Sequence, residues 1–194
     1  MNDFSSRWKR TLKEVVGGAL SRWKRPDRDA TPTVRILLYH AVHPAIDRED
    51  RLGLRVSPRM FSEQMAWLGQ AGYQVVPLSE VVNQLQQRTP FRGRAMTITF
   101  DDGYADFLSQ ALPVLAQQGF PVTLFVSTGF LTGEMRSPRA YWERWPYLTW
   151  DDLETVAGAG VEVGSHGVTH QACTGLSEHQ VREVVARERR ERPH

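Results

Sequence analysis

From Thr33 onwards, segments with the pattern of a strand alternate with segments with the pattern of a helix. Short apolar runs bounded by turn residues predict the strands, and amphipathic stretches that open at capping residues predict the helices. The strands are expected at 34–39, 74–77, 95–100, 122–127 and 161–164, and the helices at 57–72, 79–87, 105–118, 150–157 and 177–192. This alternation favours an α/β fold whose parallel strands are joined by right-handed crossovers.

The length and composition fit one domain of this class. The chain has 194 residues, of which 41% are hydrophobic and 24% are charged, and this is ordinary usage for a globular protein. No apolar stretch approaches the roughly 20 residues that cross a bilayer. The single cysteine, Cys173, excludes an internal disulfide. A disordered, collagen-like or transmembrane chain is therefore not expected.

The net charge of +2 is unevenly distributed along the chain. Residues 1–28 hold eight Lys+Arg against three Asp+Glu, whereas the remaining 166 residues hold 16 against 19. The body is therefore mildly acidic and the head is basic. No basic stripe with interleaved aromatic residues runs along the body, so nucleic acid is not an expected partner.

Residues 1–32 are expected to form a basic amphipathic helix followed by a linker. Apolar side chains recur every three or four positions from Phe4 to Trp23. One interpretation is a helix that packs on the body or frays in solvent. The other is a helix at residues 4–25 that makes peripheral contact with an anionic membrane surface through its two tryptophans.

This head does not read as a secretory signal. Lys13 and Glu14 interrupt its apolar region, and no cleavage site with small residues follows. The expected location is cytoplasmic, with the head as a candidate contact to the inner membrane surface.

Residue types that carry chemistry stand at the ends of three predicted strands. His40 ends the first, Asp101 and Asp102 follow the third, and His166 and His170 follow the fifth. Active sites of such folds lie at the carboxyl ends of the strands, so these side chains are expected on one rim. Each pair alone has an ordinary explanation, a capped turn or two solvated histidines. Together, two histidines and one carboxylate form a three-ligand metal site, and the second aspartate is free to act as a base.

The two motifs Thr-Phe-Asp-Asp-Gly-Tyr (99–104) and Ser-His-Gly-Val-Thr-His (165–170) resemble those of the polysaccharide deacetylase family, the NodB-homology group of carbohydrate esterase family 4. Similar segments also surround them, at 37–40, 61–73, 111–115 and 123–126. The resemblance covers roughly Val34 to Val185 and implies an irregular (β/α) barrel.

The family resemblance also implies a function. The family removes N-acetyl groups from amino-sugar polymers or glycans by metal-assisted hydrolysis, so the expected partner is an N-acetylated carbohydrate substrate. Asp101 corresponds to the catalytic base, and Asp102, His166 and His170 correspond to the ligands of a divalent metal, with Zn²⁺ as the expected ion. His40 is given a supporting catalytic role, with a capping histidine as the alternative. The ligand types also suit cobalt, nickel or iron.

Two departures from the family pattern are visible. The family commonly has Ser or Thr at the position of Gly167, where its hydroxyl braces the metal loop; either Thr169 replaces it or the loop is looser. The downstream Arg-x-Pro or Tyr-Pro-Tyr-Gly-like element, and the Leu-x-His element that supplies a general acid, do not occur before Pro193-His194.

These departures lead us to expect that residues 33–194 form a deacetylase domain truncated at its carboxyl end. Such a domain would be a partial barrel of about five β/α units, with an open sheet edge through which it self-associates. Two alternatives to an active deacetylase remain open. One is a truncated relative that retains metal but turns over weakly or not at all, and the other is a membrane-surface adaptor that acts through its basic head.

Overall fold

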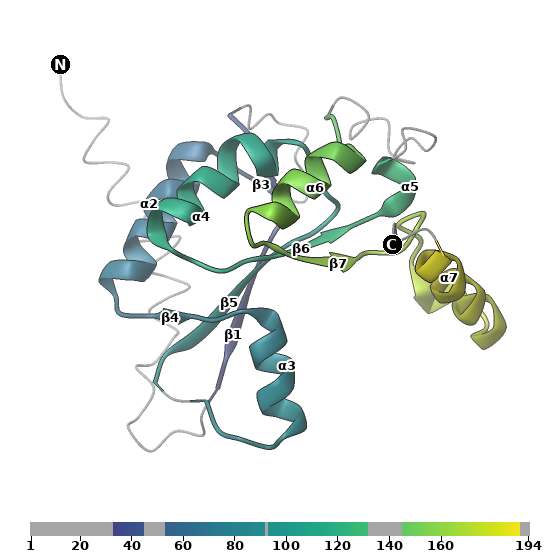
Figure 1. Cartoon of the computed structure of the whole chain (residues 1–194), viewed down its shortest axis with the longest axis horizontal. Helices are drawn as coiled ribbons and strands as arrows, with labels where there is room; N and C mark the ends of the chain where they lie inside the picture. The colour runs from purple at the N-terminus through teal and green to yellow at the C-terminus, as the bar shows by residue number, and fades with distance from the viewer. Residues whose placement is uncertain (1–32, 45–52, 92, 132–144, 191–194) are drawn as a thin grey trace. The chain divides into compact units, whose positions relative to one another are not determined.

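The computed structural model describes residues 33–44, 53–91, 93–131 and 145–190 of the chain. The helix and linker expected at 1–32 lie outside these residues. The described body is an α/β structure in which helices connect parallel strands, and this confirms the predicted fold class (Figure 1).

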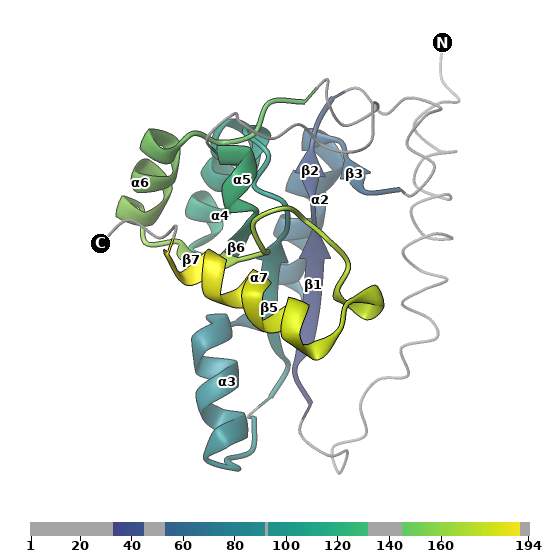
Figure 2. The same cartoon turned by 90° about the vertical axis from the view of Figure 1, so that its right-hand side faces the viewer.

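Five strands form the main sheet: β1 (Arg35–Tyr39), β4 (Gln74–Val75), β5 (Ala95–Phe100), β6 (Thr123–Val126) and β7 (Glu162–Ser165). The central strand is β5, which pairs in parallel with β1 on one side and with β4 and then β6 on the other. All of its residues are buried, as expected of a strand covered on both faces. The outer strands are β1 and β7, and the sheet does not close into a barrel within the described residues (Figure 2).

The helices are α2 (Pro58–Gln70), α3 (Leu78–Gln86), α4 (Leu112–Gln118), α5 (Thr128–Leu131), α6 (Trp150–Gly158) and α7 (Glu178–Arg190). Figure 1 shows α2, α4 and α6 along one face of the sheet. Alternate residues of β5 point into this layer, where Met96, Ile98 and Phe100 pack in one core with Phe61 and Met65 of α2. Burial of these apolar side chains joins the sheet to its helices.

The opposite face of β1 is open to solvent. Exposed and half-buried residues alternate along the strand, and Ile36 and Leu38 are 57% and 55% exposed. The period of two places both side chains on the face away from the helix layer. Nothing among the described residues covers this part of the sheet.

Three features of the backbone differ from the sequence prediction. The strands β2 (Ala41–Val42) and β3 (Arg55–Val56) form a second parallel sheet. The helix α5 lies between the strand expected at 122–127 and the helix expected at 150–157, where the sequence predicts neither a helix nor a strand. The helix expected at 105–118 is divided into a π-helical turn, η1 (Phe107–Ala111), and α4. Pro113 explains the division, because it has no N–H to donate within the helix.

The described helices include none with the combination of length and apolar content that a bilayer span requires.

Candidate metal-binding site

The candidate site residues meet at the carboxyl ends of β1, β5 and β7. The backbone N–H of Asp101 donates to the carbonyl of Tyr39 at 2.9 Å, which holds the ends of β1 and β5 together. His40 therefore follows β1 directly beside Asp101. On the other side of β6, the N–H of His166 donates to the carbonyl of Val126 at 2.8 Å. Backbone hydrogen bonds between neighbouring strands therefore bring the predicted site residues to one rim of the sheet.

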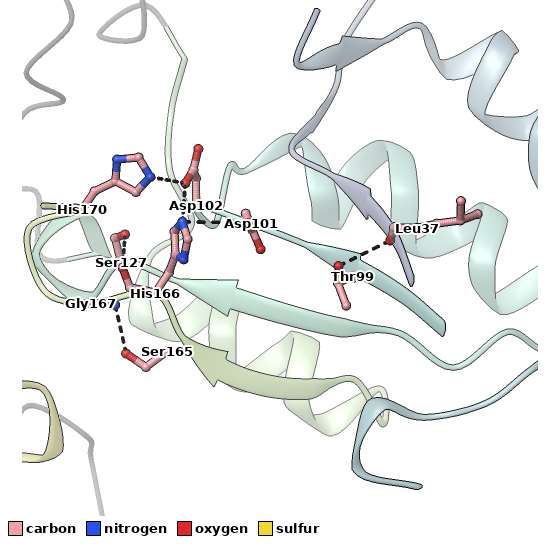
Figure 3. A network of polar contacts seen from close by, with 9 residues as sticks. All are labelled: Leu37, Thr99, Asp101, Asp102, Ser127, Ser165, His166, Gly167 and His170. Carbon is pink, nitrogen blue, oxygen red and sulfur yellow. Dashed lines mark hydrogen bonds and ion pairs between the residues drawn. The ribbon is translucent and has the colours of Figure 1, made fainter. Parts of the chain in front are cut away.

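Asp102, His166 and His170 converge on one point (Figure 3). Oδ1 of Asp102 lies 3.3 Å from Nε2 of His166 and 3.1 Å from Nε2 of His170. The Asp102 side chain is only 8% exposed, whereas those of His166 and His170 are 32% and 43% exposed. One buried carboxylate and two partly exposed imidazoles therefore share a site that is accessible from solvent.

This set of atoms fits a divalent metal ion. Oδ1 of Asp102 is enclosed by protein and has no aligned hydrogen-bond donor among the described residues. Burying a charged oxygen in this way is costly unless another group compensates it. Two imidazole nitrogens and one carboxylate oxygen are ligands that Zn²⁺ accepts, with a further position left for water or substrate.

The two adjacent aspartates differ in their ionisation. Burial raises the pKa of Asp101, although the nearby His166 and His40 oppose this shift. Burial also disfavours the charged form of Asp102, but its close contacts with His166 and His170 outweigh burial and lower its pKa. Such a separation is typical of a pair in which one carboxylate stays ionised and the other exchanges protons.

The backbone at two of these residues is unusual. Asp102 has φ of 75° and His170 has φ of 52°, and the only other described non-glycine residue with positive φ is Arg88. This region costs energy for residues with a β-carbon and is enriched at functional sites. Gly103 continues the turn with φ of 80°, and an added β-carbon would lie 3.0 Å from Cγ1 of Val126. The turn that presents Asp102 therefore requires glycine at its next position.

The histidine loop is braced by residues that the sequence analysis did not select. The Ser127 hydroxyl donates to the carbonyl of His166, and the Ser165 hydroxyl accepts a hydrogen bond from the N–H of Gly167. The N–H of Thr128 also donates to the carbonyl of Gly167 at 3.1 Å. A signal for Ser127 was present, because it ends the fourth predicted strand and so belongs to the same rim.

Gly167 itself departs from the family pattern for a backbone reason. Its φ is 83°, which a residue with a β-carbon rarely adopts. A Ser or Thr at this position would strain the loop as it is built here. The brace expected from a hydroxyl at this position or at Thr169 comes instead from Ser127 and Ser165.

A comparison with family models settles what kind of chain this is. Residues 88–191 match the model described as "Polysaccharide deacetylase". The chain belongs to the polysaccharide deacetylase family. The matched range covers more than half of the chain and includes both the aspartate and the histidine motif, so the resemblance inferred from those motifs is confirmed.

Individual members of the polysaccharide deacetylase family agree with this assignment. The chain is 29% identical to YxkH of Bacillus subtilis over 166 residues, covering 86% of this chain and 53% of that protein. It is 30% identical over 125 residues to the poly-β-1,6-N-acetyl-D-glucosamine N-deacetylase of Escherichia coli K12, covering 60% of this chain and 18% of that enzyme. The structure of IcaB from Ammonifex degensii superposes with a TM-score of 0.65 at 25% identity, over 82% of this chain and 66% of IcaB.

The chain spans about half the length of YxkH and two thirds of IcaB. Within that part, the structure brings together the four residues expected from the aspartate and histidine motifs (Figure 3). His40 follows the adjacent strand end, next to Asp101. Nε2 of His166 lies 3.9 Å from Oδ2 of Asp101. The polysaccharide deacetylase motifs therefore form one continuous polar site in this chain.

Proposed function

We propose that this chain is a metal-dependent N-deacetylase that hydrolyses the acetamide groups of an amino-sugar polymer. The observation that carries the proposal is the pair of adjacent aspartates with opposite pKa shifts beside two convergent histidines. Hydrolysis of an amide needs a group that activates water and a charge that stabilises the oxyanion. The site offers a residue for the first task and a set of ligands for the second.

Asp102, His166 and His170 are the proposed ligands of a divalent ion, with Zn²⁺ as the expected metal. When bound, such an ion polarises the acetamide carbonyl and stabilises the negative charge that develops on its oxygen. The ionised state of Asp102 suits a ligand, because metals bind the deprotonated carboxylate. The partial exposure of both histidines leaves an approach for a polymer chain.

Asp101 is the proposed general base. Its carboxyl is 15% exposed and can take the proton of an attacking water molecule at the open side of the site. Burial raises its pKa and so makes it a stronger base than an ordinary aspartate. Nε2 of His166 lies 3.9 Å from Oδ2 of Asp101, and this neighbour partly opposes the effect of burial on the pKa of Asp101.

His40 is the proposed proton donor to the leaving amine. Breaking the carbon–nitrogen bond leaves a basic nitrogen, which departs more readily once it is protonated. His40 interacts electrostatically with both Asp101 and Asp102, so it lies near the reacting atoms on the β1 side. With this assignment the chemistry does not depend on the downstream Leu-x-His element.

The proposed substrate class is an N-acetylated glucosamine polymer. This extends to the chain the substrate of its Escherichia coli relative, which is a poly-β-1,6-N-acetyl-D-glucosamine N-deacetylase. The open sheet rim and the half-exposed histidines are compatible with a chain-like ligand that crosses the site.

Acetate release by the purified full chain, reconstituted with Zn²⁺, tests the proposal. Oligomers of β-1,6- and β-1,4-linked N-acetylglucosamine are the substrates. Asp101→Asn should bind the metal but lose acetate release by at least 100-fold, because an amide cannot accept the water's proton. Asp151→Asn, at an exposed position of α6, is the matched control and should keep full activity. A metal-loaded parent that releases no acetate, or a fully active Asp101→Asn, would overturn the proposal.

A further inference from the structure

The turn that carries Asp102 is clamped by a distant segment of the chain. The N–H of Leu148 donates to the carbonyl of Gly103, and the N–H of Ala105 donates to the carbonyl of Pro146, both at 2.9 Å. Between these two bonds, Tyr104 and Tyr147 face each other in an isolated antiparallel bridge. The segment 145–148 thus fixes the backbone on both sides of Tyr104.

The two tyrosine rings continue this clamp at the level of side chains. They stack with their centroids 4.9 Å apart and an interplanar angle of 22°. Phe130 stacks on the other face of Tyr147 at 4.6 Å, and it lies 6.4 Å from the ring of His170. Tyr104 and Phe130 are almost fully buried. One stack of rings therefore connects the environments of two proposed metal ligands.

The hydroxyl of Tyr104 has two polar neighbours, the carboxylate of Asp102 and the side chain of Tyr147. A carboxylate only accepts, so the one hydroxyl hydrogen of Tyr104 goes to Asp102. The oxygen of Tyr104 is then the acceptor for the hydroxyl of Tyr147. Tyr104 is only 3% exposed, so water does not compete for its hydroxyl.

We infer that Tyr104 is a positioning residue whose hydroxyl, itself oriented by Tyr147, fixes the Asp102 carboxylate in the direction that lets Oδ1 meet both histidines. The inference rests on the proposed role of Asp102 as a metal ligand. Partners of metal ligands set the ligand's orientation, and their removal typically lowers metal affinity about 10- to 100-fold. Asp102 particularly needs such a partner, because its φ of 75° places its backbone in a region that residues with a β-carbon rarely adopt.

The arrangement makes an ordered prediction for three variants of the full chain. Tyr104→Phe keeps the ring stack and removes the donor, and should weaken Zn²⁺ binding about 10-fold. Tyr147→Phe removes only the orienting hydroxyl, and should weaken binding about threefold. The double variant should bind Zn²⁺ as weakly as Tyr104→Phe alone. The hydroxyl of Tyr147 acts on Asp102 only through the hydroxyl of Tyr104, so its removal has no further effect once that hydroxyl is gone.

Competition with a chromophoric chelator measures the Zn²⁺ affinities, and the visible spectrum of the Co²⁺-loaded chain reports on ligand geometry. Tyr73→Phe, whose ring lies next to Arg94 and away from the site, is the matched control. Melting of the metal-free chains serves as a second readout. A merely structural role of Tyr104 would lower the melting temperature while leaving the affinity and the Co²⁺ spectrum unchanged.

Three outcomes separate this inference from the proposed function. Equal affinity and spectra for parent and Tyr104→Phe would overturn the inference alone. A parent that binds Zn²⁺ and shows the ordered losses, but releases no acetate, would uphold the inference and overturn the proposed activity. A parent that binds neither Zn²⁺ nor Co²⁺ would overturn both.

Discussion

Asp101 and Asp102 are chemically identical neighbours, yet their surroundings assign them different tasks. The difference lies in contacts: two imidazoles approach Asp102 within 3.3 Å, whereas the closest one to Asp101 is 3.9 Å away. A shift of one pKa unit corresponds to about 1.4 kcal/mol of differential interaction. Small differences in distance and burial are therefore sufficient to separate a ligand from a base within one dipeptide.

The first prediction at the residue scale concerns the ligand set. His166→Ala should abolish stoichiometric metal binding, because it leaves two of the three protein ligands that a catalytic zinc site uses. Elemental analysis of the purified full chain provides the measurement. His179→Ala changes an exposed histidine of α7 that contacts Glu183 rather than the site, and it should leave metal content unchanged. Full occupancy in His166→Ala would remove His166 from the ligand set.

The second prediction concerns Asp106, which burial disfavours in its charged form. Burial raises the pKa of Asp106 to about 7, although a hydrogen bond from the backbone of Val42 and the charge of Arg55 act in the opposite direction. Between its ordinary value of 3.8 and about 7, the folded chain holds a proton that the unfolded chain has released. The free energy of unfolding therefore falls as pH rises through this window.

Asp106→Asn should remove this pH dependence while keeping an acceptor for Val42. Between pH 5 and pH 8, the free energy of unfolding should fall by about 1–2 kcal/mol more in the parent than in the variant. Urea unfolding at the two pH values measures the difference. A parent and variant with parallel pH profiles would show that Asp106 is ionised at little cost in the folded state.

At the scale of elements, the start of α3 depends on a residue of the outer strand β7, which lies 83 positions later in the sequence. Its N-cap residue is Pro77, which has no side chain able to accept a hydrogen bond. The Glu162 carboxylate, from β7, accepts hydrogen bonds from the backbone and hydroxyl of Ser79 and from the hydroxyl of Thr123 at 2.8 Å. Glu162 thus satisfies an unpaired N–H at the start of α3 and places a negative charge at the positive end of the helix.

Glu162→Gln should lower the free energy of unfolding by about 0.5–1 kcal/mol at pH 7, because it removes the negative charge at the positive end of α3 and one of the two acceptor oxygens. Burial alone would raise the pKa of Glu162, but its hydrogen bonds to Ser79 and Thr123 outweigh burial and lower it. Its contribution is therefore present above its ordinary value of 4.5 and is lost as pH falls below it. Glu154→Gln, on the exposed surface of α6, is the control. A gap between parent and Glu162→Gln that persists at pH 3 would contradict the argument.

Elements with a long, regular pattern were predictable, and short or irregular ones were not. The apolar run Ala95–Phe100 is long enough to indicate a buried strand, and the amphipathic stretch 58–70 is long enough to indicate a helix. The two-residue strands β2 and β3 carry no period, and the π-helical turn before Pro113 depends on one missing N–H. Likewise, Asp101 and His166 could be selected because they follow predicted strands, whose carboxyl ends carry the active site in such folds. The role of Tyr104 could not be predicted, because it depends on residues 145–148 folding back against its turn.

At the scale of the whole molecule, one face of the described sheet is covered by helices and the opposite face is open to solvent at the outer strand β1. The helices α2, α4 and α6 cover one side of the sheet, whereas on the other side Ile36 and Leu38 of the outer strand β1 are more than half exposed. An outer strand with apolar side chains is a template for pairing with another chain. The contact of residues 4–25 with membranes, the separate segment at 1–32 and a cytoplasmic location stay predictions, because residues 1–32 lie outside the described part.

The last prediction concerns this open face. We expect the purified chain to self-associate in a concentration-dependent way, because burying Ile36 and Leu38 against a second copy removes apolar surface from water. Sedimentation velocity over a hundredfold range of concentration is the measurement. Leu38→Lys should shift the chain toward the monomer by placing a charge on the outer strand, a device that natural sheets use against edge pairing. Trp67→Lys, at an exposed position of α2 on the helix-covered side, should not. A parent that sediments as a monomer throughout this range would contradict the prediction.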